Sequence, residues 1–247
     1  MRSRTFFIAA ALLLAAASVR AQDGDYDNDD VYAPVDRPTG GFVGGELMFA
    51  RPQGEFRDFV DQGWGGGLHY IHRLSRDGAL AVRVDGSYLN YGHESFRVPL
   101  SGTIGGRVNV DVTTTNNIAF LGVGPQIGLP SGALRPYVNG FVGVSYIWTQ
   151  TSVEGTNNDN DPFASSTNYD DATFAYGGGA GLYIPVRRGH TPVSIDAGLT
   201  YRRNGQADYL REGGITDNPD GSITLSPIRS DTDLLTFHIG VSVGISR

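Results

Sequence analysis

The stretch 118–148 constrains the fold more than any other part of the chain, because its apolar residues recur at every second position. It reads IAFLGVGPQIGLPSGALRPYVNGFVGVSYIW, with a Pro-Ser-Gly turn near its centre. The apolar positions are Ala119, Leu121, Val123, Ile127 and Leu129 before the turn and Val138, Val142, Val144, Tyr146 and Trp148 after it. A period of two indicates β-strands. Because the intervening positions are mostly small or polar, the pattern predicts a hairpin with one apolar face.

Six further segments show the same alternation, so the sequence predicts eight strands. They are residues 41–50, 63–74, 79–91, 173–185, 192–203 and 234–246. These lengths are close to the roughly nine to eleven residues that a tilted strand needs to cross a bilayer. The predicted loops 51–62, 92–115, 150–172 and 204–233 are long and polar, whereas the connections between them are short. The sequence therefore predicts an all-β fold, an eight-stranded antiparallel up-and-down transmembrane β-barrel with short periplasmic turns and long external loops.

The first 39 residues differ in character from the rest. Residues 1–21 combine Arg2 and Arg4 with a short apolar run and small residues before position 22, which is the pattern of a cleaved signal peptide. Residues 22–39 are acidic, and we expect a periplasmic leader ahead of an outer-membrane β-barrel at 40–247. The predicted route is export to the periplasm and then insertion into the outer membrane. With no Cys and a formal charge of −7, the chain offers neither a disulfide framework nor a basic face for nucleic acid.

Charged and polar residues recur among glycines on the parity opposite to the apolar face. The interior of an eight-stranded barrel is only wide enough to be filled by side chains, so we expect these residues to pair with one another as a plug. The predicted interior polar network is Glu46, His69, Arg73, Arg83, Asp85, Asp196, Arg202 and His238. We interpret the two histidines as members of a hydrogen-bonded plug rather than as metal ligands. The sequence thus predicts no catalytic residue, no cofactor and no metal site.

Aromatic residues cluster at the ends of the apolar faces that adjoin the long loops. They are Trp64, Tyr88, Tyr146, Trp148, Phe174 and Tyr201. Aromatic side chains at one level of a barrel are typical of an interfacial girdle. Within the fourth predicted strand, Pro125 cannot donate a ladder hydrogen bond, and we expect a bulge or a local break there.

Three Gly-rich and aromatic-rich strands resemble a known family. The segments RPYVNGFVGVSYIW (135–148), TFAYGGGAGLYIPV (173–186) and LLTFHIGVSVGIS (234–246) are similar to the small eight-stranded outer-membrane barrels of the OmpA, OmpX and opacity-protein type. The resemblance is architectural and covers residues 40–247. It implies outer-membrane lipid, lipopolysaccharide and the barrel-assembly machinery as partners, and it does not identify an external ligand. The chain departs from the family in ending with Ile245-Ser246-Arg247 rather than with an aromatic residue.

These observations favour a non-enzymatic outer-membrane β-barrel that presents four long external loops for surface interaction or envelope integrity. The alternative is a narrow channel or small-ligand transporter, which requires a continuous wet lumen. A barrel hydrolase acting through His93 and Ser95 is a third hypothesis, because the second predicted loop contains Gly-His-Glu-Ser. A soluble periplasmic β-sandwich is a fourth, although it does not account for aromatic residues at one end.

Overall fold

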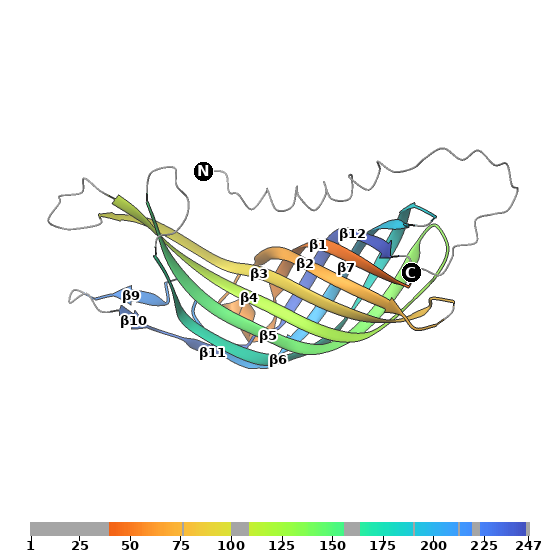
Figure 1. Ribbon diagram of the computed structural model, residues 1–247. Coiled ribbons are helices and arrows are strands. Elements are labelled where there is room, and N and C mark those ends of the chain that lie inside the picture. The colour runs from red at the N-terminus through yellow and green to blue at the C-terminus, as the bar shows by residue number, and fades with distance from the viewer. Residues whose placement is uncertain are drawn as a thin grey trace, which may run out of the picture.

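The computed structural model describes residues 40–75, 77–99, 109–155, 164–189, 191–211, 213–218 and 223–245. Eight antiparallel strands close into a barrel in the order β1-β12-β7-β6-β5-β4-β3-β2 (Figure 1). The barrel strands are β1 (Gly41–Pro52), β2 (Gly63–Arg73), β3 (Leu80–Pro99), β4 (Asn109–Gly128), β5 (Arg135–Gly155), β6 (Ala164–Arg187), β7 (Val193–Asn204) and β12 (Leu234–Ile245). Sequential strands pair with each other, and β1 pairs with β12 to close the ring. The predicted fold class is confirmed. The predicted signal peptide and acidic leader lie outside the described residues.

The barrel has its apolar side chains outside and its charged side chains inside. Val142 is 51% exposed on the outer surface, whereas Arg83 and Asp196 are buried in the interior. The exposed apolar set also includes Leu47, Leu68, Leu121, Val138, Val144, Leu199 and Ile239. A water-soluble sandwich would bury these side chains and expose the charges. The closed ring pairs the backbone groups between strands, so lipid can surround it without meeting an unpaired sheet edge. These are the properties of a transmembrane β-barrel.

No helix among the described residues is long and apolar enough to span a membrane.

The barrel wall has a local irregularity at Pro125 that follows from the sequence. The β4–β5 pairing stops at Val123↔Val142 and resumes in the same register at Gln126↔Asn139. The ladder is therefore broken around Pro125 without a bulge, which is one of the two outcomes predicted there.

The glycines of the inner face make room for rings. A Cβ at Gly181 would collide with the ring of Tyr137, and one at Gly122 would collide with Phe120. Both aromatic side chains are buried in the lumen, and a side chain at Gly181 on the neighbouring strand, or at Gly122 two residues along the same strand, would displace them.

The predicted loops 92–115 and 150–172 are largely strand, which corrects the sequence-based expectation. Strands β3, β4, β5 and β6 have 20, 20, 21 and 24 residues, against 12, 11, 12 and 12 for β1, β2, β7 and β12. The long strands remain paired beyond the barrel, with register shifts at Asn90/Gly92 and Thr149/Gln150. We call this four-stranded projection (residues 91–99, 109–117, 148–155 and 164–172) the external sheet, after the side of the membrane predicted for it from the sequence (Figure 1). Its segments are polar but rich in Thr and Val, which favour strands.

The external end of the barrel is covered by an apolar cap. The cap consists of the 3₁₀ helix η2 (Gly54–Asp58) with Val60, and of the paired strands β8 (Gln206–Tyr209) and β11 (Ile228–Asp231). Its side chains form one buried cluster with residues of the barrel strands: Met48, Ala50, Phe56, Val60, Leu89, Ile118, Ile147, Ala207, Tyr209 and Leu234. Strands β9 (Ile215–Asp217) and β10 (Ile223–Leu225) form a separate hairpin (Figure 1). The first predicted loop and the β8 and β11 segments of the fourth therefore fold back over the barrel mouth, whereas β9 and β10 extend away from it (Figure 1).

Candidate functional site in the barrel lumen

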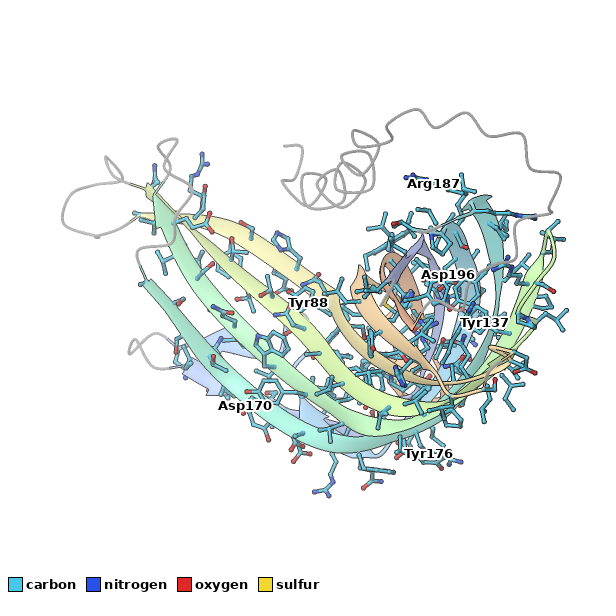
Figure 2. All side chains as sticks on the ribbon, turned by 45° about the vertical axis from the view of Figure 1, so that its right-hand side comes forward. Tyr88, Tyr137, Asp170, Tyr176, Arg187 and Asp196 are labelled. Atoms are coloured by element: carbon cyan, nitrogen blue, oxygen red, sulfur yellow. The ribbon has the colours of Figure 1, made fainter. Side chains whose placement is uncertain are left out.

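The charged residues of the lumen come from five neighbouring strands. Glu46 lies on β1, His69 on β2, Arg83 and Asp85 on β3, Asp196 and Arg202 on β7, and His238 on β12. Their side chains point inward because all of them stand on the parity opposite to the exposed apolar residues. Asp196 is completely buried, and Figure 2 shows it inside the barrel wall together with Tyr137. The lumen is therefore a polar interior enclosed by an apolar exterior.

Arg83 is the centre of an ionic network that joins three carboxylates. Its Nε donates to Asp85 Oδ1 at 2.6 Å. Its two terminal nitrogens lie 3.6 Å from Glu46 Oε2 and 3.7 Å from Asp196 Oδ2. It also donates to the hydroxyl of Tyr183 at 3.2 Å. Because buried charges require partners, this arrangement accounts for the acids on three strands around one guanidinium.

Each lumenal histidine contacts a carboxylate rather than the other histidine. His69 Nδ1 lies 3.4 Å from Glu46 Oε2, and its Nε2 is 3.4 Å from Ser242 Oγ. His238 Nε2 lies 3.7 Å from Asp196 Oδ1. The Tyr137 hydroxyl bridges the second pair, since it donates to Asp196 Oδ1 at 2.9 Å and lies 3.2 Å from His238 Nε2. The structure thus places six of the eight predicted network residues in one connected group.

The other two predicted network residues, Arg202 and Arg73, lie outside this connected group. Arg202 stacks over Phe120 at 3.8 Å and donates to Ser87 Oγ at 3.1 Å, while its Nε and Nη1 have no hydrogen-bond partner among the described residues. Arg73 lies over the ring of Phe42 at 4.7 Å, at the mouth formed by the short turns. The alternation in the sequence therefore predicted that both arginines face inward, but neither belongs to the ionic cluster around Arg83.

Sequence reasoning missed two tyrosines that belong to the network. Tyr137 and Tyr183 stack with ring centroids 4.5 Å apart, and each contacts a charged member of the network. Both stand on the inner parity of their strands, which was the available signal. A tyrosine hydroxyl in an interior filled with charges is a hydrogen-bonding group and not only a space-filling ring.

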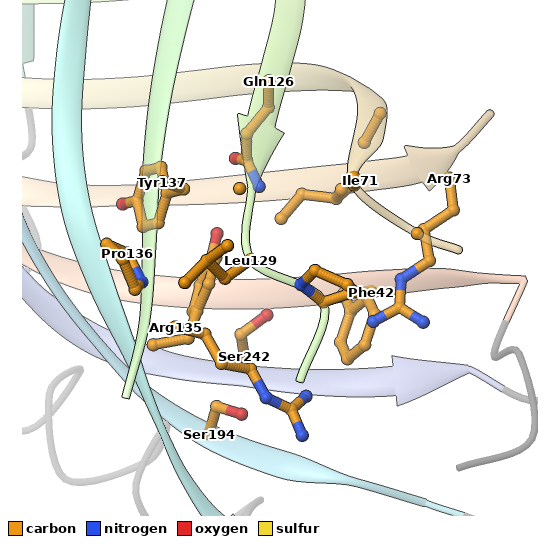
Figure 3. A pocket seen from close by; sticks show the side chains of 16 residues that line it. Phe42, Ile71, Arg73, Gln126, Leu129, Arg135, Pro136, Tyr137, Ser194 and Ser242 are labelled. Atoms are coloured by element: carbon orange, nitrogen blue, oxygen red, sulfur yellow. The ribbon is translucent and has the colours of Figure 1, made fainter. Parts of the chain in front are cut away.

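Two small cavities flank the network. One opens at the mouth with the short turns, holds about 50 Å³, and is lined by Phe42, Arg73, Arg135, Gln126, Tyr137 and Ser242 among others (Figure 3). The second, of about 20 Å³, lies between Glu46, Arg83, Phe120, Arg202 and His238. Tyr137 lines both. Each has room for one or a few water molecules, and the network separates them.

The six predicted girdle residues lie on the outer surface. Trp64 and Phe174 are 60% exposed, and Tyr88, Tyr146 and Tyr201 are exposed as well. Trp148 is half-buried because it packs between Tyr88 and Tyr146, with ring centroids 5.8 and 5.4 Å apart. Whether these rings mark a membrane interface stays a prediction.

The residues considered for a hydrolase do not converge. His93 and Ser95 stand on the outer face of β3, opposite Thr115 and Thr113 of β4. Glu94 points to the other face of the same strand, since successive side chains alternate. Ser95 Oγ accepts a hydrogen bond from Thr113 at 3.2 Å. The arrangement is that of neighbouring polar side chains on a strand.

The class of this protein follows from three features of its fold: eight antiparallel strands close into a ring, the exterior is apolar and the interior is charged. It is a small transmembrane β-barrel of the outer-membrane type. The expected resemblance to the small eight-stranded outer-membrane barrels is thereby confirmed at the level of the fold. No family model and no curated protein matches the sequence.

Solved structures with a similar fold include outer-membrane and surface proteins. Neisserial surface protein A is 11% identical, over 85% of this chain and 98% of its own, with a TM-score of 0.44. Ail, the attachment invasion locus protein of Yersinia pestis, is 14% identical over 83% and 99%, also with a TM-score of 0.44. A major outer membrane protein from Thermus thermophilus is 12% identical over 82% and 98%, with a TM-score of 0.40. At these identities the similarity concerns the fold alone.

Proposed function

We propose that this chain is a non-enzymatic outer-membrane surface protein whose barrel anchors a stiff external sheet. The observation that carries the proposal is the length of four adjacent strands, which have 20 to 24 residues where a bilayer crossing uses about half that number. At roughly 3.3 Å per residue, about ten further residues project some 30 Å beyond the membrane. Long strands held in register present a fixed surface rather than mobile loops.

The outer face of the external sheet supports a role in contact with sugars or lipid head groups. Two rows of polar side chains cross all four strands in register. They are His93, Thr115, Gln150 and Thr167 in one row and Ser95, Thr113, Ser152 and Ser165 in the next. Both rows follow directly after the aromatic residues Tyr88 and Trp148 along the strands. A partner at this level of an outer membrane is the oligosaccharide of lipopolysaccharide, which hydroxyl and amide groups can bind.

The lumen supports an anchor over the alternative of a channel. The cavities hold about 50 and 20 Å³ and are separated by the Arg83 network, while Phe56 and Tyr209 of the cap close the external mouth. Recordings in planar bilayers address the alternative: the anchor requires no conductance steps above background, and reproducible steps would favour the channel.

The absence of Cys from the chain makes the orientation directly testable. Ser95→Cys places a thiol on the external sheet, and Ser131→Cys places one in the short turn between β4 and β5, where both serines are exposed. A membrane-impermeant maleimide should label the first variant on intact cells and the second only after the outer membrane is permeabilised. Heat-modifiable gel mobility and outer-membrane fractionation serve as controls for folding and location. Labelling of Ser131→Cys alone on intact cells would reverse the proposed orientation and contradict the proposal.

A further inference from the structure

Three potential metal ligands meet in the lumen on adjacent strands. Glu46 on β1, Asp196 on β7 and His238 on β12 each offer a ligand atom, and these atoms lie within 4.8 Å of one another. All three side chains are buried. In the strand register, Gly240 stands between the two acids, because it pairs with Glu46 on one side and Asp196 on the other. A Cβ at this glycine would collide with the carbonyl oxygen of Gly45 and with Glu46 Cβ, so no side chain fits between the two acids at this position.

The same three residues carry buried polar atoms without hydrogen-bond partners. Glu46 Oε2, Asp196 Oδ2 and His238 Nδ1 accept or donate no hydrogen bond among the described residues. The two carboxylate oxygens have only the long ion-pair contacts to Arg83 and His69. Most buried polar atoms in proteins have a hydrogen-bond partner, and an exception calls for water, an ion or strain. One bound cation would give the two carboxylate oxygens a partner and would also be within reach of one ring nitrogen of His238.

The charge of the cluster also favours a cation. The Arg83 network contains three carboxylates, Glu46, Asp85 and Asp196, against the guanidiniums of Arg83 and of the adjoining Arg202. One negative charge is left over while the histidines are neutral. Arg83 faces the other two acids only with its terminal nitrogens, and its short contact, of 2.6 Å, is made by Nε to Asp85. An ion would displace only the contacts at 3.6 and 3.7 Å.

We propose that Glu46, Asp196 and His238 form a binding site for a divalent transition-metal ion, with Zn²⁺ as the reference ion. One imidazole and two carboxylates are ligand types that suit such ions, and a small inward movement would bring the donors to about 2.0–2.2 Å from the metal. His69 contacts Glu46 at 3.4 Å and holds that carboxylate in place. The proposal departs from the sequence-based expectation of a plug without metal, and it does not depend on the proposed surface function.

A cavity also leads toward the site from the mouth formed by the short turns. The 50 Å³ cavity opens at that mouth and reaches Tyr137 and Ser242. Tyr137 contacts Asp196 and His238, and Ser242 contacts His69. The cavity therefore ends one side chain away from the ligands, on the side opposite to the cap.

The test uses the folded, tag-free barrel in detergent, titrated with Zn²⁺ by calorimetry and analysed for bound metal after dialysis. We expect stoichiometric binding that is lost in Glu46→Gln, Asp196→Asn and His238→Gln, and weakened about 10- to 100-fold in His69→Gln. His72→Gln on β2 and His93→Gln on the external sheet are the matched controls, because both histidines lie outside the network. With Co²⁺ in place of Zn²⁺, the visible absorption should report nitrogen and oxygen ligation in the wild type and disappear in His238→Gln.

Heat-modifiable mobility must show that each variant is folded before its binding is compared. If an acid-to-amide variant does not fold, His238→Gln decides the matter, since it conserves polarity and removes no charge from the lumen. Absence of stoichiometric Zn²⁺ binding in the wild type would overturn the proposal. So would unchanged affinity in His238→Gln, or loss of binding in either control variant, which would place the metal on the surface.

Discussion

The lumen and the external sheet each contain an arginine paired with an aspartate, and the two pairs illustrate how differently these regions are stabilised. In the lumen, Arg83 Nε lies 2.6 Å from Asp85, and its side chain is 5% exposed. On the external sheet, Arg97 Nε lies 2.8 Å from Asp111, and its side chain is 58% exposed. The two distances are nearly equal, but the surroundings are not. Buried charges depend on their partners, whereas exposed charges retain water as an alternative.

The largest effect is expected from removing the buried cation. Arg83→Met leaves Glu46, Asp85 and Asp196 close together without their shared partner. Uncompensated buried charge of this kind costs about 3–5 kcal/mol in the free energy of unfolding. Urea unfolding of the barrel in lipid vesicles, with EDTA present and followed by Trp fluorescence, measures the loss.

Arg97→Gln is the matched control for that experiment, because it removes a cation with the same short contact to an aspartate. Its unfolding midpoint should remain close to that of the wild type. Equal shifts in the two variants would show that burial does not distinguish the two pairs.

A second contrast lies within the cap. Phe56 is fully buried, with its ring 5.2 Å from Tyr209 and 5.7 Å from Tyr91, whereas Phe59 one turn later is 37% exposed. Burial also raises the pKa of the Tyr91 and Tyr209 phenols, as expected in an apolar cluster. Phe56→Ala should weaken the cap by about 3 kcal/mol through the cavity that it leaves. We expect faster hydrogen exchange and proteolysis at residues 53–60 and 206–211, with heat-modifiable mobility retained.

Phe59→Ala should leave both measurements nearly unchanged, since its ring is partly in solvent. If Phe56→Ala abolished barrel folding altogether, the cap and the barrel would form one cooperative unit instead of two. That outcome would contradict the division between a stable barrel and a locally opening cap.

The sequence predicted the barrel well because two physical constraints act on every membrane-crossing strand. Lipid requires apolar side chains on one face, and the narrow interior accepts small or paired polar side chains on the other. Apolar residues therefore alternate with small or polar ones along each strand. The external sheet faces water on much of its surface, and residues such as Thr113, Thr115 and Ser152 carry no alternation. Only the frequency of β-branched residues indicated strand there, and that preference depends on context.

The lumen shows a different limit of sequence reasoning. The odd or even position of a residue in its strand predicts whether its side chain points inward. Which inward side chains meet depends on their height along the barrel axis and on the stagger between neighbouring strands. Arg83 and Arg202 have the same parity, yet only Arg83 reaches three acids. The contact between His238, Asp196 and Tyr137 joins β12, β7 and β5, and no spacing in the sequence encodes it.

The smallest expected effect concerns the exposed pair itself. Arg97 donates to both oxygens of Asp111, at 2.8 and 3.2 Å, and this hydrogen bonding holds the pKa of Asp111 below its ordinary value of 3.8. A carboxyl whose pKa is depressed in the folded state stabilises that state above its unfolded pKa, and the contribution is lost as pH falls through the folded pKa. The tip of the β3–β4 pair should therefore loosen slightly only in acid, below the ordinary pKa of an aspartate.

Hydrogen exchange at residues 95–99 and 109–113, corrected for the intrinsic pH dependence of exchange, measures this loosening. In Asp111→Asn the pH dependence should disappear, because no proton is taken up at that position. High salt should reduce the difference between wild type and variant, since exposed charges are screened. An equally large pH dependence in Asp111→Asn would show that other acids cause the loosening. The Arg97–Asp111 pair would then contribute nothing measurable, and the paired strands themselves would stabilise the external sheet.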